Sequence, residues 1–314
     1  MRTELLQNTI NGFRYKHWTL LEAFAYFLKG VARELKIAQD MFLEYHKKVV
    51  CRNFKKRWLK KDDKGEFYFD LNGALVPDVS TEKHIFYSFA HVIFDDTFLV
   101  PCFYNDNYDK TIVECLDRCT LEGPYGYRDG TFDVTVAKND VVIDAGAWIG
   151  DFSAYAAFKG AIAYAFEPVE ETFRLLYETA ELNKGKIIPV KKGLSSSEGE
   201  INILIDQENS GGNSFIIKRK DNMIEEIINV TTLDRFVEEN KLESVDFIKA
   251  DIEGAEREML KGATYVLKTF APKLALCTYH LPDDPEVLEK LILEANPDYK
   301  VVQLRHKLFA AVVR

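Results

Sequence analysis

Apolar side chains follow two different spacings along the chain, and the spacing changes after about residue 110. In residues 11–61 they recur at three- and four-residue steps, which places them on one face of a helix. Gly30 interrupts this run and is expected to separate two helices. Residues 66–100 mix aromatic and polar side chains and predict short strands or helices. We therefore expect residues 1–110 to form a mainly helical, mixed region.

Beyond residue 139, short apolar segments rich in β-branched residues alternate with helical segments. The expected strands are 141–143, 161–166, 186–190, 200–205, 227–230, 245–250, 273–278, 299–304 and 308–313, and the expected helices are 150–159, 170–183, 232–239, one from 254 and 285–294. Such alternation predicts a parallel sheet with helices on both faces. The last two strands are too close for a crossover helix and must be antiparallel. Strands 200–205 and 227–230 suggest a hairpin around Gly211–Gly212. The predicted class is α/β, with residues 111–314 as the second domain.

The turn after the first of these strands is the strongest chemical signal in the sequence. It reads Asp144-Ala145-Gly146-Ala147-Trp148-Ile149-Gly150. In an open parallel sheet, ligands bind at the carboxyl ends of the strands. Gly146 would allow a tight turn and a close approach to a ligand, and Gly150 would let the next helix pack close. Glu167 ends the following strand, where an acid can accept hydrogen bonds from ribose hydroxyls.

Asp144 stands where a dinucleotide-binding loop has its first glycine. A carboxylate there would repel a pyrophosphate, and it suits the ammonium and sulfonium charges of S-adenosylmethionine. A nicotinamide dehydrogenase is therefore disfavoured. Leu194 and Ser195, which follow the third core strand, are placed to contact an adenine.

These and further segments resemble the FkbM-type methyltransferases over roughly residues 122–314. The matching segments are Asp140–Ala147, Gly150–Ser153, Ala165–Pro168, Gly193–Ser195, Thr231–Asp234 and the most distinctive one, Asp246–Glu256. Trp148 departs from the smaller polar residue that many members have. The resemblance implies a class I, Rossmann-like methyltransferase fold, with a seven-stranded sheet that ends in an antiparallel hairpin. The predicted cofactor-binding residues are Asp144, Gly146, Ala147, Gly150, Glu167, Leu194 and Ser195.

Residues that could assist methyl transfer are expected at the ends of the fourth and fifth core strands. Asp251 follows the fourth and His280 the fifth, so we predict these two as catalytic; either could remove the proton of an acceptor hydroxyl. Glu253, Tyr125 and Tyr127 are candidate substrate contacts. Interaction with the N-terminal dipole of the next helix is an equal role for Glu253, and packing is the simpler role for the two tyrosines. Two ligands are too few to predict a metal site, so a divalent cation stays possible but is not predicted.

Composition narrows the partners. The formal net charge of −9 disfavours nucleic acid. No segment approaches a membrane span and no secretory signal is visible, so we expect a cytoplasmic protein. The five cysteines form no Cys-x-x-Cys pair and are expected to be reduced thiols. A homo-oligomer is possible.

The sequence thus predicts a methyltransferase that uses S-adenosylmethionine to methylate a hydroxyl on a saccharide or small metabolite. Two alternatives stay open: a non-catalytic protein that binds S-adenosylmethionine or S-adenosylhomocysteine, and an RNA or protein methyltransferase on the same fold. The first 110 residues would then shape the acceptor site or an oligomer interface.

Overall fold

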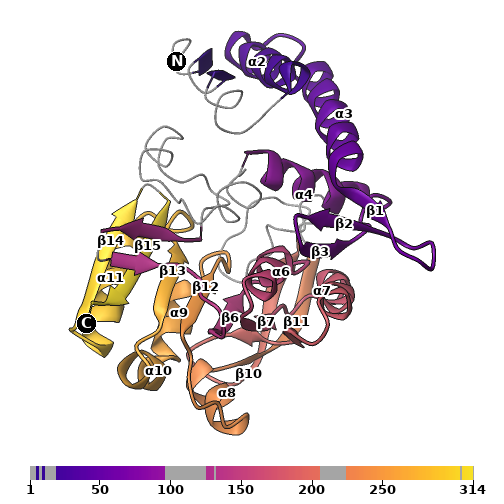
Figure 1. Cartoon of the computed structure of the whole chain (residues 1–314). Helices are drawn as coiled ribbons and strands as arrows, with labels where there is room; N and C mark the ends of the chain where they lie inside the picture. Colours follow the sequence, from indigo (N-terminus) through magenta and orange to yellow (C-terminus); the bar gives the residue numbers. More distant parts are fainter. Residues whose placement is uncertain are drawn as a thin grey trace. The chain divides into compact units, whose positions relative to one another are not determined.

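The computed structural model describes residues 5–6, 9–10, 19–95, 125–130, 132–205, 224–304 and 306–313. Contacts divide the chain into two compact units (Figure 1). The first contains residues 1–72 and 78–124, and the second contains residues 73–77 and 125–314.

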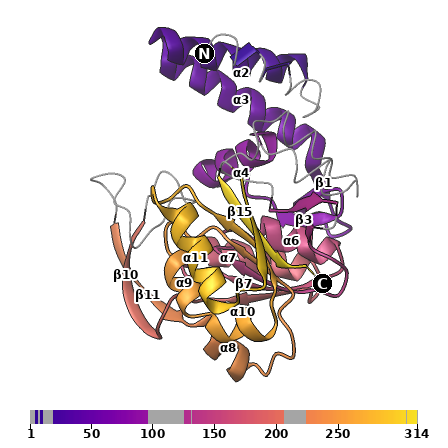
Figure 2. The same ribbon diagram turned by 90° about the vertical axis from the view of Figure 1, so that its left-hand side faces the viewer.

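The first unit is built on two helices that lie side by side, α2 and α3 (Figure 2). Its elements are α2 (Leu20–Leu35), α3 (Gln39–Trp58), β1 (Leu59–Lys61), β2 (Phe67–Leu71) and α4 (Lys83–Asp95). The two helices separate at Lys36 and Ala38, which have left-handed backbone conformations. The expected break at Gly30 is wrong: this glycine lies inside α2, where an added Cβ would come 2.4 Å from the Leu5 side chain. The glycine lies in regular helix and packs against a neighbouring side chain, with no turn at this position.

The second unit contains a seven-stranded sheet in the order β14-β15-β13-β12-β6-β7-β8. Its strands are β6 (Val141–Ala145), β7 (Ile162–Phe166), β8 (Ile187–Val190), β12 (Phe247–Ala250), β13 (Lys273–Cys277), β14 (Tyr299–Leu304) and β15 (Lys307–Val312). Strands β13, β12, β6, β7 and β8 pair in parallel, and β15 pairs antiparallel with both β13 and β14. The predicted parallel sheet with an antiparallel terminal hairpin is confirmed.

Helices cover both faces of this sheet. They are α6 (Asp151–Phe158), α7 (Glu170–Leu182), α8 (Leu233–Glu239), α9 (Glu256–Lys261), α10 (Thr264–Thr269) and α11 (Asp284–Ala295). The main core packs α8, α9, α10 and α11 against Ile143, Ile248 and Leu274, and Figure 2 shows α9, α10 and α11 gathered on that face. Side chains alternate between faces along a strand, so Val142 and Asp144 point to the opposite face. There Ser153 of α6 contacts Asp144.

Short strands complete the second unit. β3 (Ala74–Pro77) packs on α6 and α7, and β4 (Tyr127–Asp129) pairs with β5 (Phe132–Val134). β10 (Gly199–Ile205) and β11 (Ile224–Thr231) form the predicted antiparallel pair, and β11 also pairs with β9 (Gly193–Leu194). The expected turn at Gly211–Gly212 lies outside the described residues.

Charged side chains tie the strands together at their amino ends. Lys273 Nζ donates to Asp140 Oδ2 at 2.8 Å and to the Thr135 carbonyl at 2.6 Å. Asp246 Oδ2 accepts a hydrogen bond from the Val141 N–H at 2.8 Å. These bonds join the amino ends of β6, β12 and β13, at the edge opposite the loops that carry Gly146, Glu167 and Asp251.

Two further predictions can be compared with the structure. No helix in the described part of the chain is both long and apolar enough to cross a membrane. Cys51 and Cys277 are free thiols, whereas Cys102, Cys115 and Cys119 lie outside the described residues.

Candidate functional site

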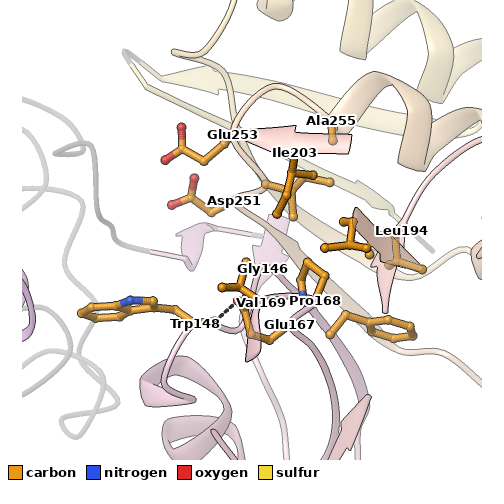
Figure 3. Close-up of a pocket in the computed structure, with 14 residues that line it drawn as sticks. Gly146, Trp148, Glu167, Pro168, Val169, Leu194, Ile203, Asp251, Glu253 and Ala255 are labelled. Carbon is orange, nitrogen blue, oxygen red and sulfur yellow. Dashed lines mark hydrogen bonds between the residues drawn. The ribbon is translucent and has the colours of Figure 1, made fainter. Parts of the chain in front are cut away.

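A pocket of about 660 Å³, open to solvent, lies at the carboxyl edge of the sheet. It is beside the topological switch point between β6 and β12, where the strand order along the sheet reverses. Such edges are where open α/β sheets bind ligands. The lining residues come from the loops after β6, β7, β8 and β12 and from β10 and β11 (Figure 3); they are Gly146, Trp148, Phe166, Glu167, Pro168, Val169, Gly193, Leu194, Ile203, Ile228, Asp251, Ile252, Glu253 and Ala255.

Glu167 is the buried acid of this pocket. Its Oε2 accepts the Trp148 N–H and its Oε1 accepts the Val169 N–H, both at 3.0 Å. Burial raises the pKa of Glu167 to about 7, although these backbone hydrogen bonds lower it. The Thr172 hydroxyl also acts on this carboxylate and lowers its pKa, and because a carboxylate has about four lone-pair positions, acceptor capacity stays available for a ligand hydroxyl. The structure thus brings Glu167 to the pocket, as predicted.

Trp148 shapes the loop through its backbone. Its φ of 51° is left-handed, and this conformation directs its N–H to Glu167. The indole extends away from Glu167 in Figure 3. Leu194, Ile203 and Ile228 supply an apolar wall suited to the face of an adenine. The contribution of Ile203 and Ile228, from β10 and β11, was not foreseen, because nothing in their local sequence indicates a ligand.

The two loop glycines are required by protein neighbours. Gly146 has a φ of 73°, and a Cβ there would come 2.0 Å from the Asp251 carbonyl oxygen. Gly150 has a φ of 85°, and a Cβ there would meet Leu176 and Thr179 of α7 at 2.8 and 3.0 Å. Gly146 therefore lets the loop after β6 approach the loop after β12. Gly150 lets α7 pack closely against the start of α6.

Asp144 lies elsewhere than the cofactor prediction assumed. It is fully buried, accepts the Ser153 hydroxyl at 2.6 Å, and has Lys249 Nζ 3.1 Å from its Oδ1. Asp144 and Lys249 are direct partners in the β6–β12 register. An opposite charge this close neutralises Asp144, so its carboxylate does not repel a pyrophosphate or attract a sulfonium. The charge of Asp144 therefore does not distinguish S-adenosylmethionine from a dinucleotide.

Lys249 was missed, although a lysine within the apolar strand Phe247–Ala250 is a visible signal. Its Nζ also donates to the Gly146 carbonyl at 2.6 Å. Burial lowers the pKa of Lys249, but the carboxylates of Asp144, Asp251 and Asp151 outweigh this and raise it overall. Lys249 therefore stays charged and holds the pocket loop.

Asp251 follows β12 at the pocket rim. Its Oδ2 accepts the Tyr125 hydroxyl at 2.6 Å, and its Oδ1 accepts the Tyr279 hydroxyl at 3.0 Å. Burial raises the pKa of Asp251, but His280, Lys307 and Lys249 lower it to about 2 overall. The carboxylate is therefore ionised at neutral pH. Its neighbour Glu253 points in the same direction (Figure 3).

His280 lies beneath this rim, with a fully buried side chain. Its Nε2 is 3.4 Å from Asp251 Oδ1 and 3.3 Å from Glu253 Oε2, and its Nδ1 is 3.1 Å from Glu256 Oε1. Burial lowers the pKa of His280, but Glu256, Asp251 and Glu253 raise it to about 9 overall. With these neighbours alone the imidazole carries its proton at neutral pH and cannot accept another. A base role for His280 needs that proton removed.

The remaining predicted residues lie outside the pocket lining. Ala147 is buried, and its N–H donates to the Phe166 carbonyl. Ser195 is buried, and its N–H donates to Thr231. Tyr127 stacks on Phe309, with ring centroids 5.6 Å apart, so packing is its role here and its assignment as a substrate contact is not supported. Tyr125 reaches the site through Asp251.

Comparison with known proteins identifies the family of the chain. A family model described as the methyltransferase FkbM domain matches residues 144–301. The hexuronic acid methyltransferase AglP of Haloferax volcanii is 30% identical over 167 residues, which cover 53% of this chain and 67% of that protein. The methyltransferase sdnD of Sordaria araneosa is 29% identical over 169 residues, covering 43% of this chain and 65% of that protein.

Among solved structures, the crystal structure of methyltransferase FkbM from Methylobacillus flagellatus matches with a TM-score of 0.46 and 19% identity. The match covers 85% of this chain and 59% of that one, so this chain spans about three fifths of that protein. The family model spans half of this chain and includes Glu167, Asp251 and His280. The chain belongs to the FkbM methyltransferase family.

Proposed function

We propose that this protein is an S-adenosylmethionine-dependent methyltransferase that methylates a hydroxyl of a saccharide or small metabolite. The observation that carries the proposal is Glu167, a buried carboxylate with unused acceptor positions at the end of β7, in the pocket of a chain from a methyltransferase family.

Different pocket residues contact different groups of the cofactor. Glu167 accepts hydrogen bonds from the ribose hydroxyls, and Leu194, Ile203 and Ile228 enclose the adenine. Asp251 and Glu253, at the rim, supply negative charge for the ammonium and sulfonium groups. When bound, S-adenosylmethionine supplies a methyl carbon attached to a positively charged sulfur. The protein's part is to align an acceptor oxygen with that carbon.

The acceptor class is supported by the relative from Haloferax volcanii, which is named as a hexuronic acid methyltransferase. Asp251 and Glu253 face the pocket and are suited to hydrogen-bond the hydroxyls of a sugar. Tyr125 and Tyr279 fix the Asp251 carboxylate, so its oxygens keep a constant position relative to the acceptor.

Calorimetry with S-adenosylmethionine and NAD separates the proposed cofactor from a dinucleotide. We expect binding of S-adenosylmethionine only, and its loss in Glu167→Ala. Glu170→Ala is the matched control, because Glu170 is an exposed acid three residues further along the chain. Binding of NAD alone would overturn the proposal.

Mass spectrometry of reactions with hexuronic acids, neutral sugars, small alcohols, RNA and peptides then identifies the acceptor. A gain of one methyl group on a hydroxyl compound supports the proposal. A gain on RNA or peptide alone would replace it, and cofactor binding without transfer to any acceptor would favour a non-catalytic binding protein.

A further inference from the structure

Three side chains, two at the pocket rim and one buried beneath it, place metal-binding atoms around one small volume. One oxygen each from Asp251 and Glu253 and one nitrogen of His280 lie within 4.8 Å of one another. Figure 3 shows the carboxylates of Asp251 and Glu253 side by side. The sequence supplied Asp251 and His280; the structure adds Glu253 as a third ligand-type group.

His280 distinguishes this cluster from an ordinary group of acids. Its side chain is fully buried, and neither ring nitrogen has a hydrogen bond of acceptable geometry within the described residues. Nε2 nevertheless faces both Asp251 and Glu253, at 3.4 and 3.3 Å. A buried polar atom without a hydrogen bond needs an explanation, and an ion between these three groups is one.

The distances fit ligands that share an ion better than a protonated histidine bonded to carboxylates. Charge-assisted N–H···O bonds are about 2.7–2.9 Å long, shorter than either contact of Nε2. Two ligands about 2.1 Å from one ion, with angles between right-angled and tetrahedral, lie about 3.0–3.4 Å apart.

Glu256 orients the histidine from the other side. Its Oε1 lies 3.1 Å from His280 Nδ1, and its two carboxylate oxygens accept the N–H groups of Ile252 and Gly254 at 2.9 and 3.0 Å. Metal-binding histidines commonly turn their second nitrogen to a carboxylate fixed in this way, which holds the first nitrogen toward the metal.

We propose that Asp251, Glu253 and His280 bind a divalent cation that prefers mixed oxygen and nitrogen ligands, such as Mn²⁺. Asp251 and Glu253 line the pocket, so an ion that they hold would lie within reach of an oxygen of the acceptor. That role rests on the proposed function, whereas binding of the cation does not.

Electron paramagnetic resonance of Mn²⁺ added to the full-length, metal-stripped protein tests the site without cofactor or acceptor. We expect one bound ion per chain and loss of binding in Glu253→Gln and His280→Gln. Glu256→Gln should weaken binding by about 10- to 100-fold through the orientation of His280. Glu258 lies on the same helix, but its side chain bonds Ser196 and Lys261, so Glu258→Gln should leave Mn²⁺ binding unchanged.

Circular dichroism and thermal unfolding of the same samples report whether each variant is folded, and calorimetry with S-adenosylmethionine on the wild-type protein reports cofactor binding separately. A wild-type protein that binds S-adenosylmethionine but not Mn²⁺ would overturn the metal site and leave the proposed function standing. Mn²⁺ affinity that is unchanged in Glu253→Gln and His280→Gln would also overturn it. If EDTA leaves methyl transfer unchanged, the role toward the acceptor is wrong.

Discussion

Glu167 and Asp144 are both acids at or near the carboxyl edge of the sheet, yet only Glu167 reaches the pocket. Glu167 follows the last strand residue, so its side chain is free of the strand's alternation. Asp144 lies within β6, where alternation directs it to the face covered by α6. The sequence predicted the position of both acids. It did not show that Lys249 lies opposite Asp144, because the pairing of β6 with β12 joins residues 105 positions apart.

Cofactor affinity should depend on the ionisation of Glu167. Its pKa of about 7 means that the carboxylate is protonated below that pH, and a protonated acid accepts ribose hydroxyls poorly. We expect the affinity for S-adenosylmethionine to fall as pH decreases through about 7, approaching tenfold per pH unit. Titration calorimetry across this range measures it. Glu167→Gln should bind weakly and lose this pH dependence; an equal dependence in that variant would assign it to another group.

The same group has the opposite effect on folding. The folded-state pKa of Glu167 lies above its ordinary value of 4.5, so the folded protein holds the proton more tightly than the unfolded chain. Its contribution to the free energy of unfolding therefore decreases as pH rises from about 4.5 to about 7, and stays constant above that.

Lys249 should matter most when it is removed alone. Lys249→Met leaves Asp144 buried without its opposite charge, which costs about 3–5 kcal/mol of unfolding free energy. The double substitution Asp144→Asn with Lys249→Met removes both charges and should recover most of that loss. Urea denaturation of the two variants makes the comparison. Equal destabilisation of both would show that the ion pair is not the cause.

The order of strands and helices in the second unit followed from spacing alone, and most predicted boundaries agree within a few residues. Helix α10 was not predicted, because it follows α9 after only a short turn and the two read as one segment. The expected break at Gly30 was wrong for a related reason: a glycine that packs within a helix looks the same in sequence as one that forms a turn.

Gly146 and Gly185 allow the cost of a left-handed backbone to be measured apart from the cost of a steric clash. Both have positive φ, 73° and 75°, but a Cβ on Gly146 would come 2.0 Å from a carbonyl oxygen, whereas Gly185 has open space. We expect Gly185→Ala to cost about 1–2 kcal/mol, the penalty of the conformation itself. Gly146→Ala should cost at least twice that and weaken cofactor binding. Thermal unfolding and calorimetry measure both effects, and equal costs would show that the loop relaxes around the new Cβ.

At the scale of the molecule, the predicted cofactor contacts all come from the second unit. The first unit has its own apolar core, in which Phe54, Phe69 and Phe89 pack with ring centroids 5.0–5.9 Å apart. Sequence spacing gave the helical character of this unit but no function for it, because its surface carries no motif. Its predicted role in acceptor binding or oligomerisation stays a prediction.

Hydrogen exchange should distinguish the second unit, which holds the cofactor pocket, from the first unit. On binding of S-adenosylmethionine, we expect slower exchange in β7, β9 and the loop after β12, and no change in α2 and α3. Mass spectrometry of peptides reports each element. Protection of α2 or α3 by the cofactor alone would mean that the first unit takes part in cofactor binding, and protection only after an acceptor is added would assign it to the acceptor site.

The hydrogen bonds and ion pair at the amino ends of the strands affect how new acceptor specificities can evolve in this protein. Lys273, Asp140 and Asp246 join the amino ends of β6, β12 and β13 at the edge opposite the pocket. Substitutions among them should lower the amount of folded protein in cells while leaving the choice of acceptor unchanged. Substitutions of side chains that line the pocket should do the reverse, except at positions such as Gly146 where a protein neighbour leaves no room for a Cβ. New specificities can therefore arise at one edge without a matching loss of stability, because the sheet is held from the other.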